Sequence, residues 1–136
     1  MIYEIQAQFT RIDGKGNDKV IKEKYMVENA ESFGDAETQG YNHCDGETDL
    51  DIVAIKRSKV REIINKKSAT EDEKIWFADV ADVRTNDDGE EVEIIYKVAL
   101  YATSWDDANA KVKYYLSQGF DMTILSIKKT KFTEVI

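Results

Sequence analysis

Residues 52–64, IVAIKRSKVREII, and residues 124–136, ILSIKKTKFTEVI, are two copies of one segment rich in isoleucine and lysine. The copies lie 72 residues apart and are identical at six of thirteen positions. The same offset relates SFGDA at 32–36 to SWDDA at 104–108. Self-similarity at one fixed spacing across most of a chain predicts a tandem duplication.

The first half, residues 1–64, has the pattern strand, strand, helix, strand. Residues 3–9 alternate apolar and polar side chains, as a half-buried strand does. Residues 13–17, DGKGN, predict a hairpin turn, because glycine and asparagine tolerate a positive φ. A second strand is expected over 19–29, and Ser32 then has the character of a helix N-cap.

The second half, residues 74–136, repeats this order with a better-formed helix. Residues 86–89, NDDG, predict the turn, and Ser104 predicts the N-cap. Residues 65–73 are polar and charged, so we expect a surface linker between the two repeats.

Neither half has enough core to be stable alone, since each has about 65 residues and one helix. We therefore expect a single α+β domain over residues 1–136: two ββαβ repeats, six main strands in antiparallel sheets, and two helices packed on them with pseudo-twofold symmetry. Whether the two sheets merge or stack is left open by the sequence. The side chains expected to be largely buried are Ile52, Ile55, Ile124, Ile127, Trp105 and Phe33.

The composition is that of a globular chain, with 42% hydrophobic and 34% charged residues. No apolar run approaches the roughly 20 residues that a membrane helix needs, so no membrane association is expected. The N-terminus begins with a strand pattern and not with a signal region, and Cys44 is the single cysteine. We expect a cytoplasmic protein, and the net charge of −8 disfavours indiscriminate binding to nucleic acid.

Several stretches match a known family in order and over almost the whole length. They are YEIQAQF at 3–9, YMVENAESFGDAE at 25–37, DIVAIKRSKVREI at 51–63, KIWFADV at 74–80 and WDDANAKV at 105–112. With these the chain resembles the domain of unknown function 4494 family, small uncharacterised proteins of Bacteroides-type bacteria and their phages. The resemblance implies a bacterial or phage setting, and brings no reaction, cofactor or catalytic residue with it.

Patterns that suggest catalysis or metal binding are better explained as structure. His43 and Cys44 are adjacent, but zinc needs three or four ligands and no second cluster follows. The acidic run at 45–51 lacks the glycine and distal glutamate of a calcium loop. DGKG at 13–16 is followed by a strand, whereas a phosphate loop opens a helix. We expect no enzyme activity, no metal and no cofactor.

The basic residues of the repeated segments are the candidate binding residues. One explanation is structural, because lysines on strands also protect exposed sheet edges. The functional alternative is two positive stripes that bind single-stranded nucleic acid or another phosphate-bearing ligand, with Trp76 or Tyr114 as a stacking surface. The candidate residues are Lys56, Arg57, Lys59, Arg61, Lys128, Lys129, Lys131 and Trp76.

A second hypothesis uses the acidic residues instead. An acidic face would bind a basic surface on a host protein that handles nucleic acid, and so inhibit it by mimicry of charge. In either case exposed edge strands favour a homodimer that forms by edge-to-edge pairing.

Overall fold

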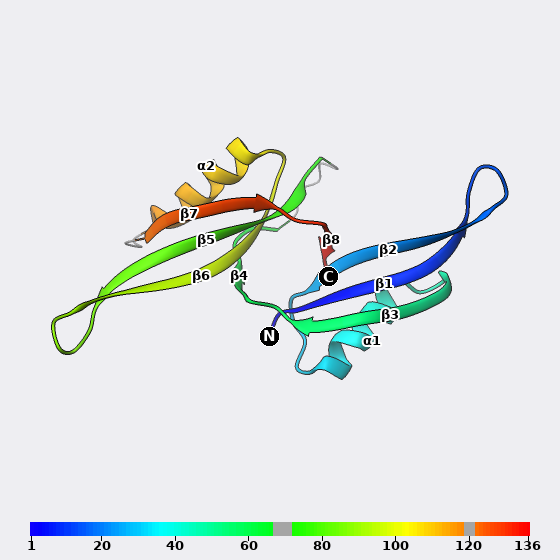
Figure 1. Cartoon of the computed structure of the whole chain (residues 1–136), viewed down its shortest axis with the longest axis horizontal. Coiled ribbons are helices and arrows are strands. Elements are labelled where there is room, and N and C mark those ends of the chain that lie inside the picture. The colour runs from blue at the N-terminus through cyan, green and yellow to red at the C-terminus, as the bar shows by residue number, and fades with distance from the viewer. Residues whose placement is uncertain (67–71, 119–121) are drawn as a thin grey trace. The chain divides into compact units, whose positions relative to one another are not determined.

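The computed structural model describes residues 1–66, 72–118 and 122–136. The chain forms two compact units, each a sheet with one helix (Figure 1). The first unit contains Met1–Ser58 together with Lys131–Ile136, and the second contains Lys59–Thr130. The expected linker at 65–73 falls in the second unit, and its residues 67–71 lie outside the described residues.

The sheet of the first unit has the strand order β3-β1-β2-β8. Strand β1 is antiparallel to both β2 and β3, whereas β8 is parallel to β2. The helix α1 packs mainly on β3 and β1. The bounds are β1 Tyr3–Ile12, β2 Asp18–Val27, α1 Phe33–His43, β3 Thr48–Arg57 and β8 Phe132–Val135.

The sheet of the second unit has the order β4-β6-β5-β7, and its short edge strand β4 is parallel to β6, as β8 is to β2 in the first sheet. The helix α2 packs mainly on β7 and β6. The bounds are β4 Val60–Ile63, β5 Lys74–Thr85, β6 Glu91–Ala102, α2 Trp105–Leu116 and β7 Met122–Lys129.

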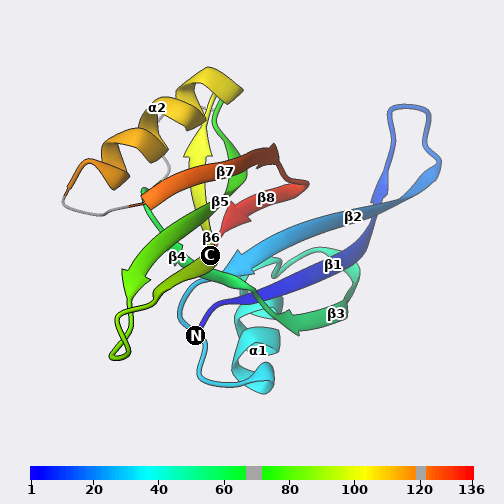
Figure 2. The ribbon, with the colours of Figure 1, turned by 60° about the vertical axis from the view of Figure 1, so that its left-hand side comes forward.

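The α+β class with two helices on antiparallel strands is confirmed, and the two sheets are separate. In the described part of the chain the six main strands are present, but two four-residue strands were not predicted, because each repeated segment breaks after its first pair of basic residues and forms two strands. The break at 58–59 separates β3 from β4, and the break at 130–131 separates β7 from β8. Each half of the sequence thereby gives its last short strand to the sheet of the other half (Figures 1 and 2). The duplication itself stays a prediction from the sequence.

Both predicted N-caps are present. The Oγ of Ser32 accepts a hydrogen bond from the backbone N–H of Asp35 at 3.0 Å. The Oγ of Ser104 accepts one from the N–H of Asp107 at 3.1 Å. Each serine satisfies an N–H group that the first helical turn leaves without a partner, which fixes where the helix begins.

The burial of Phe33 and Trp105 was predicted wrongly: they are 53% and 50% exposed. Both are the first residue of a helix, and side chains on a helix tilt toward its N-terminus, so these two extend past the end of the packed face. Of the predicted core isoleucines, Ile52 is buried. The other three are partly buried and pack against the cores of their units: Ile55, Ile124 and Ile127.

The helix α1 packs against its sheet through small residues. Its buried residues are Ala36 and Gly40, the smallest available. A Cβ atom on Gly40 would lie 2.6 Å from the Cδ1 of Ile5 and 3.1 Å from the Cδ1 of Ile52. A glycine that weakens the helix is therefore needed for helix–sheet packing.

Neither of the helices in the described part of the chain is long and apolar enough to cross a membrane.

Candidate functional site

The face of the first sheet opposite α1 carries polar side chains from its three long strands. Tyr3, Ile5, Ala7 and Phe9 belong to the buried core. Strand alternation then places Glu4, Gln6 and Gln8 on the opposite face, which we call the helix-free face.

The pairing of strands brings two lysines to this face. Gln6 of β1 pairs with Lys24 of β2 on one side and with Ala54 of β3 on the other. Glu4 pairs with Lys56 of β3. Paired residues have side chains on the same face, so lysines from two strands flank the central strand β1.

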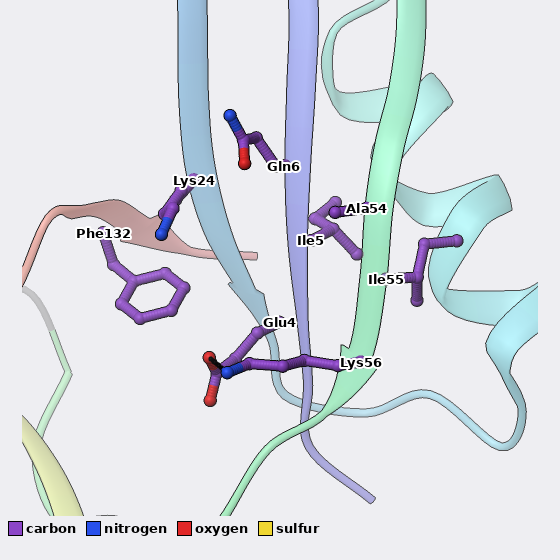
Figure 3. Close-up of a pocket in the computed structure, with 8 residues that line it drawn as sticks. All are labelled: Glu4, Ile5, Gln6, Lys24, Ala54, Ile55, Lys56 and Phe132. Atoms are coloured by element: carbon purple, nitrogen blue, oxygen red, sulfur yellow. Dashed lines mark ion pairs between the residues drawn. The ribbon is translucent and has the colours of Figure 1, made fainter.

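These side chains line a shallow hollow of about 120 Å³ (Figure 3). Gln6 and Lys24 stand on one side of it, and Lys56 reaches toward Glu4 at the other. The ring of Phe132, from the exchanged strand β8, lies beside Lys24 and forms an apolar wall. A hollow of this size is smaller than the roughly 300–1,000 Å³ of typical small-molecule pockets, so it can hold one chemical group of a larger ligand.

The two lysines differ in how they are neutralised. The Nζ of Lys56 lies 3.5 Å from the Oε1 of Glu4, and its side chain is 74% exposed. Glu4 is 12% exposed and also accepts a hydrogen bond of 2.7 Å from the Oγ of Ser58. Lys24 is exposed and has no ion pair with any residue that the structure describes. One lysine is thus loosely paired and the other is available to an anion.

The other candidates in the first unit lie elsewhere. Arg57 follows Lys56 but pairs with Tyr3, so it lies on the side of the sheet that carries α1. Lys131 precedes β8, which is the sheet edge opposite β3. The predicted stripe of consecutive basic residues is therefore divided between faces and edges.

In the second unit the candidate residues also separate. Lys128 pairs with Phe77 on the helix-free face, whereas Lys129 pairs with Trp76 on the other face. The indole of Trp76 packs on the core, and its Nε1 donates a hydrogen bond of 3.1 Å to the carbonyl oxygen of Ala102.

Two further candidates lie at the opposite edge of the second sheet. Lys59 precedes β4 and is exposed. The guanidinium of Arg61, on β4, lies 4.4 Å from the centre of the Tyr96 ring, a cation–π contact.

The helix-free face of the second sheet contains an ion pair at its centre. The Oδ1 of Asp79 lies 3.0 Å from the Nζ of Lys97, and its Oδ2 accepts a hydrogen bond of 3.0 Å from Ser126. Burial opposes the ionisation of Asp79. The hydrogen bonds from Lys97 and Ser126, together with the charges of Lys97 and Lys128, outweigh burial and lower its pKa.

Lys24, Gln6 and Phe132 were not identified from the sequence. Lys24 is one of three lysines in a strand that also carries acidic residues, and Phe132 lies far from it in the sequence. The repeat offset gave one usable signal, because it marked Lys56 and Lys128 as equivalent.

No cluster of three metal-ligating side chains occurs in the ranges that the structure describes. Cys44 is buried, and desolvation raises the pKa of its thiol. The Nε2 of His43 lies 2.6 Å from the Oε1 of Glu134, so this histidine connects the end of α1 to the exchanged strand β8.

A search of curated proteins finds no match to the chain, and a search of solved structures finds none either. The model of one family, the domain of unknown function DUF4494, matches residues 1–136, which is the whole chain. The chain therefore belongs to the DUF4494 family.

Proposed function

We propose that the chain is a non-enzymatic binding protein, acting in a bacterial or phage-infected cytoplasm, that holds single-stranded nucleic acid on the helix-free face of its first sheet. The observation that carries the proposal is the convergence of Lys24 and Lys56, from two strands, on one hollow beside Gln6 and Phe132.

These groups suit the parts of a nucleotide strand. The two ammonium groups can contact phosphate, and the amide of Gln6 can donate to and accept from a base edge. The partly buried ring of Phe132 offers aromatic surface to a base. Lys22 pairs with Gln8 on the same face and extends the positive surface along β2.

The size and openness of the site favour an extended polymer. A hollow of about 120 Å³ cannot enclose a nucleotide-sized molecule, but a single-stranded nucleic acid lying across the sheet needs to place only one group in it. Three lysines also limit the strength of binding, so the proposal is a weak and salt-sensitive interaction.

The test is fluorescence anisotropy of a fluorescein-labelled oligothymidylate, and of oligouridylate, across a NaCl series. Each lysine that contacts phosphate contributes about 0.7 to the slope of log affinity against log salt. The double variant Lys24→Gln/Lys56→Gln should therefore flatten the slope by about 1.4 and weaken binding at low salt.

The matched control is Arg57→Gln/Lys15→Gln. It removes the same charge from the same unit, but Arg57 lies on the side of α1 and Lys15 in the hairpin turn. Equal losses in the two double variants would show attraction by net charge alone and refute this site. No binding by the unmodified protein at low salt would refute the nucleic-acid function itself.

One observation favours a second candidate, an acidic inhibitor that binds a host protein. Strands β5 and β6 form a hairpin (Figure 1), and the end of this hairpin exposes apolar side chains beside acidic ones. A basic partner surface with an apolar centre would complement the end of this hairpin. The exposed side chains are Val83, Val92, Ile94, Ile95, Asp87, Asp88, Glu90, Glu91 and Glu93.

This alternative is tested by comparing the host proteins captured by the intact protein with those captured by a variant carrying Ile95→Ser and Glu93→Gln. A basic partner retained by the first protein and lost by the second would support it. Equal capture by the intact protein and the variant would refute a role for the end of this hairpin.

A further inference from the structure

The helix-free faces of the two sheets correspond residue by residue. In each sheet, one residue of the central strand pairs with a lysine on one side and with a small residue on the other. A second lysine lies two positions beyond that small residue. The sets are Gln6, Lys24, Ala54 and Lys56 in the first sheet, and Asp79, Lys97, Ser126 and Lys128 in the second.

The difference at the centre is one of charge. In the second sheet the central residue is Asp79, whose carboxylate contacts Lys97 and Ser126, both at 3.0 Å. Lys97 also lies over the Phe77 ring at 5.5 Å and is only 30% exposed. An anion already occupies the position between the two lysine-bearing strands.

In the first sheet the central residue is the neutral Gln6. Glu4 does carry a charge on this face, but it lies two residues before Gln6 and pairs with Lys56. The second sheet has Phe77 at the position that corresponds to Glu4. The hydroxyl of Ser58 also holds the Glu4 carboxylate. Among the residues that the structure describes, no acidic group therefore lies at the position beside Lys24 that corresponds to the Asp79 carboxylate.

We infer that Asp79 is a built-in substitute for a phosphate group, so that the first sheet carries a working phosphate site and the second carries an equivalent site closed by its own carboxylate. This inference rests on the proposed function and deepens it. It places a phosphate of the bound nucleic acid between Lys24 and Lys56, and it gives a stoichiometry of one nucleic-acid molecule per protein chain.

Two nearly isosteric substitutions reverse the difference. Asp79→Asn removes the charge, keeps an oxygen that can accept from Ser126, and changes a side chain that is 34% exposed. Gln6→Glu places a carboxylate beside Lys24. Binding of labelled oligothymidylate is measured as stoichiometry and affinity at low salt, for each variant and for the double variant Gln6→Glu/Asp79→Asn.

We expect one oligonucleotide per unmodified chain and two per Asp79→Asn chain. Gln6→Glu should bind at least about tenfold more weakly, because like charges across an interface repel. The double variant should bind one oligonucleotide, and adding Lys128→Gln to it should remove that binding.

The inference can also be tested on the unmodified protein, through the reactivity of its lysines. Acetylation of lysines followed by mass spectrometry should show that the oligonucleotide protects Lys24 and Lys56 but leaves Lys97 and Lys128 as reactive as before. Protection of both pairs would overturn the inference.

These experiments distinguish failure of the inference from failure of the proposed function. If Gln6→Glu loses binding but Asp79→Asn still binds one oligonucleotide, the closed second site is refuted and the first-sheet site stands. If no protein of the series binds, the proposed function fails and the inference fails with it.

Discussion

Replacing Gly40 by alanine tests how closely α1 packs on its sheet. Helix propensity alone predicts a stabilisation of about 1 kcal/mol, because glycine is the poorest helix former after proline. The structure predicts the opposite sign. The new methyl group would lie 2.6 Å from the Cδ1 of Ile5, which is 2% exposed and has little room to move.

The magnitude follows from two opposing terms. Overpacking a well-packed core costs about 1–3 kcal/mol, and the gain in propensity offsets about 1 kcal/mol of it. We therefore expect Gly40→Ala to lower the free energy of unfolding by up to about 2 kcal/mol.

Gly34→Ala is the matched control in the same helix. A Cβ atom there would meet only the Oγ of Ser32, at 3.8 Å. This variant should be neutral or up to about 1 kcal/mol more stable. The difference between the two variants isolates the steric term.

Urea unfolding followed by far-UV circular dichroism measures both variants. Tryptophan fluorescence is a poor probe here, because Trp76 and Trp105 both belong to the second unit. Ile5→Val removes the clashing Cδ1, so Gly40→Ala should be less harmful in that background. A Gly40→Ala protein stabilised as much as Gly34→Ala would refute the reasoning.

Three further substitutions or treatments have defined expectations. Asn65→Ala should cost the second unit about 1–3 kcal/mol in urea unfolding, because the Asn65 amide accepts from and donates to the backbone of β6 at 2.7 and 2.9 Å. Cys44 should react with Ellman's reagent at pH 8 far more slowly in the native protein than in urea, since burial raises its pKa and blocks access. Asp107→Asn should lower stability by about 1 kcal/mol at neutral pH. The backbone N–H of Thr103 and the side chain of Lys111 lower the pKa of Asp107, so its contribution exists above the unfolded pKa of about 3.9 and disappears as the pH falls through the folded value. Thermal melts of both proteins at a series of pH values should therefore converge in acid.

The elements that depend on local signals could be predicted from the sequence. The hairpin turns and the N-caps at Ser32 and Ser104 depend on residues within a few positions of one another. The exposure of Phe33 and Trp105 was missed because helical spacing defines a stripe but not where along the helix the sheet ends.

The strand exchange and the candidate site could not be predicted, because both depend on pairing between distant segments. The segment 52–64 reads as one strand, and nothing local says that its last four-residue strand joins another sheet. Lys24 becomes notable only when the register places it beside Gln6. Its neighbours in the sequence, Glu23 and Tyr25, lie on the other face, where the Tyr25 hydroxyl bonds the Glu23 carboxylate.

The exchanged strand β8 has a consequence for synthesis on the ribosome. The first unit contains most of the N-terminal half of the chain, yet its sheet requires residues 132–135, which are translated only after the whole of the second unit. During elongation the outer edge of β2 therefore exposes unpaired N–H and C=O groups, a template for adhesion between nascent chains. Any product that stops before Phe132 keeps that edge permanently open. The first sheet can therefore be completed only after the strands of the second unit have been synthesised.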